Sequence, residues 1–215
     1  MQVKICANKS IEDAKNCIEA NADIIGILVG KKHHSDDFVN KETAKKIVDY
    51  VNKRCPVALV THLTKAEDII ELTNYIGNDI IQLHSNIDEE EVEKIVKSLP
   101  KVKLIRLIHI SDDGRVITDY KKMKYIDFYL LDSYNLKTNQ VGGTGISHDW
   151  QKSKELIKLL DKPTFLAGGL NPDNVKKAIE IVNPYGVDVN SGCKNELGKK
   201  DKNKIKKFVE NTKSN

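Results

Sequence analysis

The feature that most constrains the fold is a regular alternation of short apolar runs with longer segments of helical period. Eight runs rich in Val, Ile and Leu recur along the whole chain. Such a run predicts a buried strand, and a helical segment between two such strands predicts a parallel sheet. The strands are expected at residues 3–6, 24–29, 57–60, 80–83, 102–107, 128–131, 164–167 and 186–189.

The segments between these runs show helix start signals. Ser10 is an N-cap residue with Asp13 three positions on, and Pro172 introduces the helix before the last strand. The interval 110–125 has a poor helical period and contains the turn signal Asp-Asp-Gly, which predicts a short or irregular helix there. The other helices are expected at residues 11–20, 41–51, 65–75, 89–97, 150–160, 174–182 and 201–211.

Eight strand–helix units predict one (β/α)8 barrel domain over residues 1–215. A chain of 215 residues lies near the lower limit for this architecture, and no Pro-, Gly- or Ser-rich linker divides it. A doubly wound open sheet is the alternative, but it is typically marked by G-x-G-x-x-G after the first strand. Residues 7–10 read Ala-Asn-Lys-Ser instead. The barrel is therefore the preferred fold.

Charge and composition exclude several classes of partner. Lys and Arg number 35 against 31 Asp and Glu, and the two signs alternate along the chain, which indicates a solvated surface and no nucleic-acid partner. The basic run 199–207 spaces its lysines so that Ile205, Phe208 and Val209 share one helical face, and we interpret it as the exposed side of the last helix.

No apolar stretch approaches the ~20 residues that cross a bilayer, and the four cysteines form no C-x-x-C pair. We therefore expect a soluble, cytoplasmic protein with no membrane partner, present as a monomer or a homodimer.

In a barrel of this kind the site forms where the strands end. After the seventh strand stand Gly168 and Gly169, and after the eighth stand Asn190, Ser191 and Gly192. Glycines allow backbone N–H groups to approach an anion, and Ser adds a hydroxyl donor. Each glycine alone fits an ordinary turn, but the pair of loops predicts a phosphate site.

Two further strand ends have groups that transfer protons. Asp132 follows an apolar run, where partial desolvation would raise its pKa and make it a proton donor; a turn cap is the alternative. Cys6 ends the first strand, and an electropositive setting would lower its pKa; a buried structural cysteine is the alternative. The histidines and cysteines have no metal-ligand spacing, so no metal or other cofactor is expected.

These motifs together resemble the phosphoribosylanthranilate isomerase family of tryptophan biosynthesis. The resemblance covers nearly the whole chain and rests on the order and spacing of six stretches. They are Val-Lys-Ile-Cys at 3–6, Gln-Leu-His at 82–84, Leu-Leu-Asp at 130–132, Gly-Gly-Thr-Gly at 142–145 followed by Asp-Trp at 149–150, Ala-Gly-Gly-Leu-Asn-Pro at 167–172 with Asn-Val at 174–175, and Val-Asp-Val at 187–189 with Ser-Gly at 191–192.

The resemblance implies a (β/α)8 barrel that converts an N-linked phosphoribosyl amine into a 1-deoxyribulose phosphate without a cofactor. It assigns Asp132 as the general acid on the ring oxygen and Cys6 as the general base at C2′. The glycine loops would hold the phosphate of this small-molecule substrate. Additional substrate-binding residues are expected at Lys4, His84, Gly143, Asp188, Lys32 and His34.

The chain departs from the family pattern mainly around the second strand. Ala7 replaces a usual Gly, Lys194 replaces an acidic residue, and the usual Ser-Pro-Arg segment falls in the loop 31–39, which contains no arginine. A guanidinium fork and a point charge recognise a carboxylate differently. Either Lys31, Lys32 or a histidine replaces the arginine, or Asp36 or Asp37 faces a substrate that lacks the carboxylate.

Three functions follow from this sequence. The first is isomerisation of phosphoribosylanthranilate. The second is the same chemistry on a phosphoribosyl derivative of another amine, and the third is phosphosugar binding without catalysis. The acid–base pair favours an enzyme, because a simple binding protein needs no proton-transfer groups at both strand ends.

Overall fold

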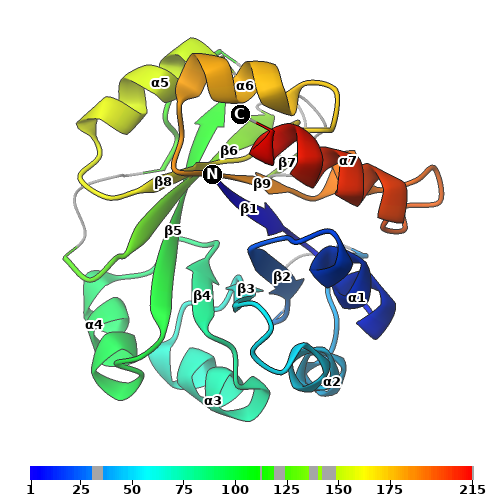
Figure 1. Ribbon diagram of the computed structural model, residues 1–215. Helices are drawn as coiled ribbons and strands as arrows, with labels where there is room; N and C mark the ends of the chain where they lie inside the picture. The colour runs from blue at the N-terminus through cyan, green and yellow to red at the C-terminus, as the bar shows by residue number, and fades with distance from the viewer. Residues whose placement is uncertain (31–35, 112, 119–123, 136–139, 142–148, 215) are drawn as a thin grey trace.

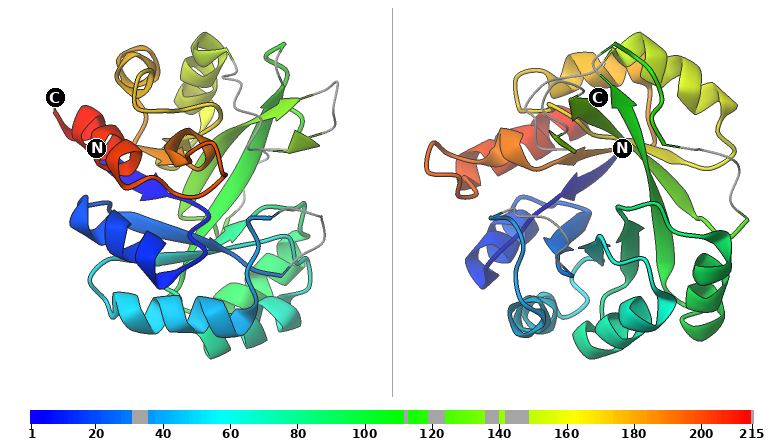
Figure 2. Two further views of the ribbon diagram at one scale, coloured as in Figure 1. Left: turned by 90° about the vertical axis from the view of Figure 1, so that its right-hand side faces the viewer. Right: turned by 180° about the vertical axis from the view of Figure 1, so that it is seen from behind.

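The computed structural model describes residues 1–30, 36–111, 113–118, 124–135, 140–141 and 149–214. Eight parallel strands surround a central axis and the helices lie outside them (Figure 1; Figure 2). The barrel strands are β1 Gln2–Ile5, β2 Ile24–Leu28, β3 Val57–Thr61, β4 Ile80–Leu83, β5 Lys103–Ser111, β6 Phe128–Asn135, β8 Thr164–Leu166 and β9 Gly186–Val189.

The sheet closes on itself. Its strand order is β5-β4-β3-β2-β1-β9-β8-β6, and β6 also pairs in parallel with β5, so no barrel strand is left at an edge. The short strand β7 (Gln140–Val141) forms an antiparallel pair with the end of β6. The predicted (β/α)8 barrel is thus confirmed, and a closed ring excludes the doubly wound open sheet.

The barrel strands differ from the prediction mainly at the ends of β5 and β6. Both continue four residues beyond their predicted ends, and they pair with each other from Ile105 with Phe128 to Ser111 with Tyr134. Polar residues such as His109 and Asp132 are therefore held within paired strands. A strand predicted from its apolar run ends at the first polar residues. The predicted strands are therefore shorter than the observed β5 and β6.

The helices begin and end within two residues of their predicted positions. As predicted, the Ser10 hydroxyl accepts a hydrogen bond from the Asp13 backbone N–H at the start of α1. Between β5 and β6, the described residues 113–118 and 124–127 contain no helix. The helices are α1 Ile11–Glu19, α2 Lys41–Val51, α3 Ala66–Ile76, α4 Glu89–Ser98, α5 Trp150–Leu159, α6 Val175–Val182 and α7 Lys202–Lys213.

Apolar residues form two layers of core. An inner cluster, which comes almost entirely from the strands, fills the barrel; it includes Ala58, Ile105, Leu130 and Phe165. A larger outer cluster joins the other face of the strands to the helices. Burial on both faces explains why the strands read as continuous apolar runs.

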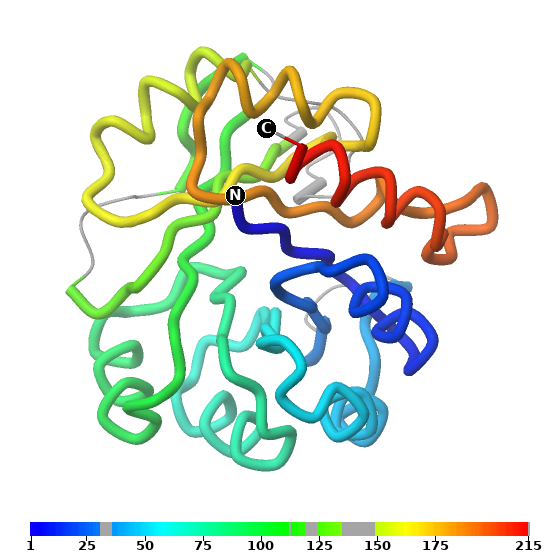
Figure 3. Tube along the Cα trace, viewed as in Figure 1, coloured from blue at the N-terminus to red at the C-terminus, as the bar shows by residue number. Residues whose placement is uncertain are grey.

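The C-terminal helix returns to the start of the chain, so that the two termini lie close together (Figure 1; Figure 3). Ile205, Phe208 and Val209 of α7 are buried, while its lysines are exposed, as predicted for the basic run. The Lys213 ammonium donates to the Asp23 carboxylate just before β2. In the part of the chain that the structure describes, no helix has the length and apolar character to cross a bilayer.

The backbone is strained where β1 leads into the site. Ala7 is buried and has a φ of +58°, in the left-handed region. The next residue, Asn8, fixes this turn because its side-chain amide donates to the carbonyls of Ile5 and Gly26 at 2.7 and 3.1 Å. A residue with a Cβ atom pays about 1–2 kcal/mol in this conformation.

We predict that Ala7→Gly raises the free energy of unfolding by about 0.5–1 kcal/mol, because relief of the strain exceeds the extra entropy that glycine loses on folding. Urea denaturation of the two proteins measures the difference. Ala14→Gly, inside α1, is the control and should lower the same quantity by about 1 kcal/mol. A glycine variant less stable than the parent would contradict this account of Ala7.

Candidate active site

A buried ion pair lies at the centre of the barrel mouth. Lys4 of β1 and Asp188 of β9 are register partners, and the Lys4 Nζ lies 3.0 Å from the Asp188 Oδ1. Side chains alternate along a strand, and Val3 and Ile5 pack in the outer core, so Lys4 faces the barrel interior. Burial lowers the pKa of Lys4, but the charges of Asp188 and Cys6 raise it more, so the ammonium keeps its proton.

The thiol of Cys6 lies beside this pair, directly after β1, and is buried. Burial raises the pKa of the thiol, the Lys4 charge lowers it and the Asp188 charge raises it, with a net rise above the usual range. The electropositive setting proposed from the sequence is therefore present, but burial outweighs it. In this structure the Cys6 thiol is protonated at neutral pH.

Gly26 of β2 creates the space that these two groups occupy. A Cβ atom at this position would lie 3.0 Å from the Cys6 Sγ and 3.2 Å from the Lys4 Nζ. Gly26 is not among the site residues predicted from the sequence. The available signal was a glycine inside the apolar strand Ile-Ile-Gly-Ile-Leu, since such a glycine often marks close approach by another group.

Asp132 lies within β6, on the strand face that also includes Leu130 of the inner core. Burial raises the pKa of its carboxyl to about 7, and the negative charge of Asp188 adds to the rise. The Ser133 backbone N–H, which donates to the Asp132 Oδ1 at 2.8 Å, and the Lys4 charge oppose it. The predicted rise of this pKa is confirmed, and near neutral pH the carboxyl both holds and releases a proton.

The two glycine loops lie against each other, as β8 and β9 are neighbours. Gly168 and Gly169 have φ values of +84° and +66°, and a Cβ atom on Gly168 would lie 2.8 Å from the Ser133 backbone nitrogen. A Cβ atom on Gly192 would lie 2.0 Å from the Leu170 carbonyl oxygen. Ser191 begins a short 3₁₀ turn, Ser191–Cys193, directly after Asn190. The close packing of these two loops therefore leaves no room for a side chain at Gly168 or Gly192.

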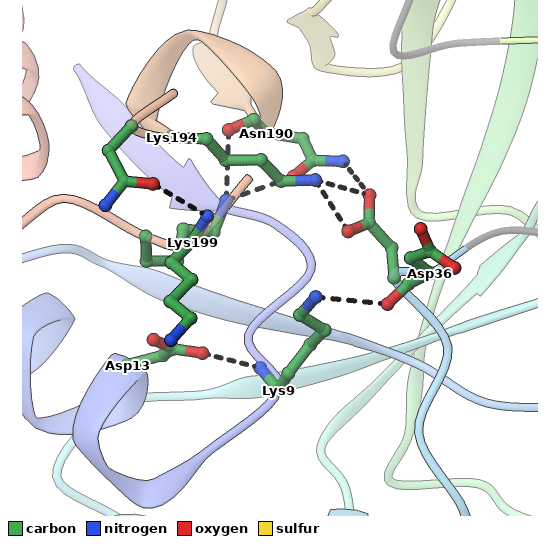
Figure 4. A network of polar contacts seen from close by, with 9 residues as sticks. Lys9, Asp13, Asp36, Asn190, Lys194 and Lys199 are labelled. Atoms are coloured by element: carbon green, nitrogen blue, oxygen red, sulfur yellow. Dashed lines mark hydrogen bonds and ion pairs between the residues drawn. The ribbon is translucent and has the colours of Figure 1, made fainter. Parts of the chain in front are cut away.

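Two departures from the family pattern contact each other. The Lys194 ammonium donates to both carboxylate oxygens of Asp37, at 2.6 and 2.8 Å, and the Asn190 amide donates to the same carboxylate at 2.9 Å. Lys9 donates to the Asp36 carbonyl oxygen at 3.1 Å. Figure 4 shows these contacts, with Lys9, Asn190 and Lys194 directed toward the segment that begins at Asp36.

The Asp37 contact bears on one alternative from the sequence, that Asp36 or Asp37 faces the substrate. Burial raises the pKa of Asp37, but hydrogen bonds from Lys194 and Asn190 outweigh it and hold the pKa below its usual range. The carboxylate is engaged with the loop after β9. The charge of Asp37 therefore holds together two loops of the mouth, the one after β2 and the one after β9.

Lys200 corrects the interpretation of the basic run as wholly exposed. Its ammonium is turned inward and donates to the Asn190 carbonyl and side-chain oxygens, at 3.0 and 3.1 Å. Burial lowers the pKa of Lys200. Lys200 precedes α7, so the helical period that places the other lysines on the exposed face does not apply to it. Its contacts place positive charge beside the loop after β9.

Imidazole rings occupy the mouth over three adjacent strands. The predicted residue His84 follows β4, and two histidines that the analysis did not single out accompany it: His62 directly after β3, and His109 in β5. Reading every strand end for polar residues would have found His62. The extension of β5, which no apolar run indicated, hid His109.

Three predicted binding residues, Lys32, His34 and Gly143, lie outside the described residues. Among the residues that the structure does describe, no group of three His, Cys, Asp or Glu side chains has the geometry of a metal site. All four cysteines are free thiols.

Comparison with known proteins agrees with this architecture. The family model for N-(5'-phosphoribosyl)anthranilate (PRA) isomerase matches residues 3–211. N-(5'-phosphoribosyl)anthranilate isomerase 2 of Methanosarcina mazei is 39% identical over 100% of this chain and 95% of its own length. The isomerase of Aquifex aeolicus is 34% identical over 100% of this chain and 99% of its own length.

Solved structures give the same result. Phosphoribosyl anthranilate isomerase of Thermotoga maritima superposes with a TM-score of 0.85 and 30% identity, covering 100% of this chain and 99% of that one. A second structure, with a TM-score of 0.78 and 27% identity at the same coverage, is of the isomerase in complex with reduced 1-(o-carboxyphenylamino)-1-deoxyribulose 5-phosphate. The family predicted from the sequence is confirmed: this chain belongs to the N-(5'-phosphoribosyl)anthranilate isomerases.

Proposed function

We propose that this isomerase converts N-(5'-phosphoribosyl)anthranilate into 1-(o-carboxyphenylamino)-1-deoxyribulose 5-phosphate, with Asp132 as general acid and Cys6 as general base. The observation that carries the assignment is a carboxyl with a pKa of about 7 and a thiol that are both coupled to the Lys4–Asp188 pair. Family membership, and a relative that binds the reduced product, support the substrate.

The reaction needs proton transfers at the ring oxygen, at C2′ and at C1′. Opening the ribose ring would otherwise expel a bare alkoxide, so protonated Asp132 delivers its proton to the ring oxygen as the C1′–O bond breaks. The nitrogen lone pair forms the iminium at C1′. The Cys6 thiolate then removes the proton from C2′, and the C–H electron pair forms the enolamine. A proton then returns to C1′ while the C2′ hydroxyl loses its own proton, which gives the ketone without any cofactor.

The Lys4–Asp188 pair sets the electrostatics of both steps. Lys4 lowers the pKa values of Asp132 and Cys6, and Asp188 raises both. Lys4 thus favours the thiolate that the base requires, while Asp188 favours the protonated carboxyl that the acid requires. Because Lys4 and Asp188 are paired, their charges act on the acid and the base while neither charge is left isolated inside the barrel.

The phosphate end of the substrate is assigned to Gly168, Gly169, Asn190, Ser191 and Gly192. Glycine backbone without Cβ atoms leaves N–H groups accessible to an anion. Lys200 donates to Asn190 and adds positive charge to this side of the mouth. A phosphate held there orients the ribose between the acid and the base. The entropy cost of bringing the reacting groups together is then incurred on binding, before the chemical step begins.

Free, buried thiols support a reducing compartment, the cytoplasm, as the place of reaction. All the groups named in the mechanism belong to one chain, so it applies equally to a monomer and to a homodimer.

The direct test supplies purified protein with phosphoribosylanthranilate and follows the loss of its fluorescence. We predict that Asp132→Asn and Cys6→Ser each lower kcat by about 10²–10⁴-fold, the usual contribution of one acid or base. Asp161→Asn and Cys55→Ser are matched controls away from the mouth and should retain turnover.

Each other outcome favours an alternative. A parent protein that binds ribulose 5-phosphate but leaves the anthranilate substrate intact would indicate a different amine. Turnover unaffected by either substitution would refute the assigned acid and base.

The pH dependence follows from the order of the two pKa values. The active form has a protonated Asp132 and an ionised Cys6. The Asp132 carboxyl, however, loses its proton at a pKa of about 7, and the Cys6 thiol loses its proton only at a higher pH. This form is a minor fraction that is constant between the two pKa values. We predict that kcat/KM rises up to pH about 7 and is then flat until the thiol ionises. A profile that falls as pH rises through 7 would show that Cys6 ionises first.

The Asp37–Lys194 pair provides a charge-exchange test of the phosphate side. Asp37→Lys or Lys194→Asp places like charges beside Asn190, and we predict that each raises KM about tenfold, the equivalent of 1.4 kcal/mol, with a smaller effect on kcat. The double exchange restores the attraction and should recover most of the loss, with a coupling energy of about 0.5–3 kcal/mol. Additive effects in the double variant would show that the pair does not orient Asn190.

A further inference from the structure

Lys200 is a cation that turns back from the segment before α7 toward the end of β9. Its ammonium donates to the backbone carbonyl oxygen and to the side-chain oxygen of Asn190, at 3.0 and 3.1 Å. An antiparallel bridge joins Lys194 to Lys200, and the Asp201 backbone N–H donates to the Cys193 carbonyl oxygen at 2.9 Å. Backbone contacts on both sides of Lys200 therefore hold its ammonium at this strand end.

The strand end that Lys200 contacts also holds Cys6. The Cys6 backbone N–H donates to the Val189 carbonyl oxygen at 2.8 Å, and Asn190 is the next residue along the chain. Cys6 and Lys200 thus bond to successive peptide groups, and the charge of each acts on the other. The end of β9 therefore brings the ammonium into the surroundings of the thiol.

Three charged side chains act on the Cys6 thiol. Burial raises the pKa of the thiol, the Lys4 ammonium lowers it, the Asp188 carboxylate raises it and the Lys200 ammonium lowers it. Lys4 belongs to β1, Asp188 belongs to β9, and Lys200 precedes α7. Two of the three charges are positive, so their sum favours the thiolate and opposes the effect of burial.

Lys200 also interacts with two other thiols, but their surroundings keep them protonated. The Cys17 thiol donates to a side-chain amide oxygen at 3.2 Å, and the Cys193 thiol donates to a backbone carbonyl oxygen at 3.8 Å. The Cys6 thiol instead accepts from the Lys4 ammonium, a group that can only donate. Of these three thiols, Cys6 is therefore the one whose ionised form the surrounding groups favour.

The charge of Lys200 and the ionisation of Cys6 support each other. Burial lowers the pKa of Lys200, a negative charge on Cys6 raises it, and the charge of Lys194 lowers it. Asp37 accepts from both Lys194 and the Asn190 amide, so a carboxylate balances the second ammonium. A thiolate at Cys6 thus completes the set of opposite charges around Lys200.

Lys200 differs from Lys4 because it acts on the base and not on the acid. The charged groups that act on the Asp132 carboxyl are Asp188, which raises its pKa, and Lys4, which lowers it. The fraction of protein with a protonated acid and an ionised base depends on the difference between the two pKa values. A charge that lowers both pKa values equally leaves this fraction unchanged, whereas the charge of Lys200 lowers only that of the thiol and increases the fraction.

We propose that Lys200 is a positioning residue of the isomerisation, whose ammonium, held on Asn190, stabilises the Cys6 thiolate without stabilising the ionised form of Asp132. This proposal rests on the proposed function, in which Cys6 is the general base. No bond to Lys200 forms or breaks, and its protons stay on Nζ throughout the reaction. Lys200 acts through Cys6 by favouring the charge state that removes the C2′ proton.

The test separates the charge of Lys200 from its hydrogen bonds. Lys200→Gln keeps a donor for Asn190 without the charge, Lys200→Arg keeps both, and Lys199→Gln removes the charge of an exposed neighbouring lysine as the matched control. The rate at which iodoacetamide alkylates Cys6 without substrate, at a pH between the pKa values of Asp132 and Cys6, measures the thiolate fraction. Mass spectrometry of the peptides distinguishes Cys6 from the other cysteines. We expect Lys200→Gln to slow this alkylation about tenfold, or 1.4 kcal/mol, and the other two variants to change it less than about twofold.

The pH profile of turnover provides a second readout, which a merely structural role would not move. In Lys200→Gln the flat region of kcat/KM should fall by the same factor, and its upper limit, set by Cys6, should move to higher pH. The lower limit, set by Asp132 at a pKa of about 7, should stay in place. Lys200→Arg should restore both the height and the upper limit of the flat region.

The outcomes separate this proposal from the proposed function. Unchanged alkylation of Cys6 in Lys200→Gln, or a rise in KM alone, would overturn the role of Lys200 even if the parent protein isomerises phosphoribosylanthranilate. Slower alkylation in a protein whose turnover survives Cys6→Ser would overturn the assigned base and leave the effect of Lys200 on the thiol standing. If Lys200→Gln fails to fold, Lys200→Met, which has an uncharged and unbranched side chain, gives the same comparison.

Discussion

The site depends on the buried ion pair between Lys4 and Asp188. The pair joins the first and last strands of the barrel, at the register position where the ring closes, so it exists only in the folded chain. It is also the electrostatic element that the acid and the base share, because each of its charges shifts the pKa values of both Asp132 and Cys6. Breaking a buried pair leaves an uncompensated charge and costs about 3–5 kcal/mol. Fold closure and the tuning of the chemistry thus rest on the same contact.

Around this centre the mouth divides into two sides of different character. Over β8 and β9, glycine backbone and the nearby Lys200 ammonium suit a compact, highly charged group. Over β3, β4 and β5 lie three imidazole rings, with centroid distances of 4.4 Å from His62 to His84 and 5.9 Å from His84 to His109. The Asp37–Lys194 contact ties the loop after β2 to the loop after β9.

Features that depend on the local sequence pattern could be predicted from the sequence. Features that depend on how distant residues pack together could not. Strand positions and the raised pKa of Asp132 follow from apolar runs, since a carboxyl at the end of such a run is desolvated wherever the strand lies. The net shift at Cys6 does not follow, because it depends on whether burial or the Lys4 charge dominates. The Asp37–Lys194 pair joins residues 157 positions apart, so each looked like an isolated departure from the family pattern. His109 was missed because a strand that continues through polar residues gives no apolar signal.

The site also reduces the stability that the rest of the fold provides. Asp132 keeps its proton in the folded chain up to a pKa of about 7, whereas an aspartate in the unfolded chain loses it near its ordinary value. Between these values the folded state binds more protons, so this residue contributes a loss of stability as pH rises through that window. Asp37 acts in the opposite sense: its lowered pKa stabilises the folded chain above the ordinary value, and the gain is lost on acidification. The two aspartates differ because one is buried beside another carboxylate and the other beside an ammonium. A proton donor near neutral pH requires the first environment, and the link between the loops requires the second.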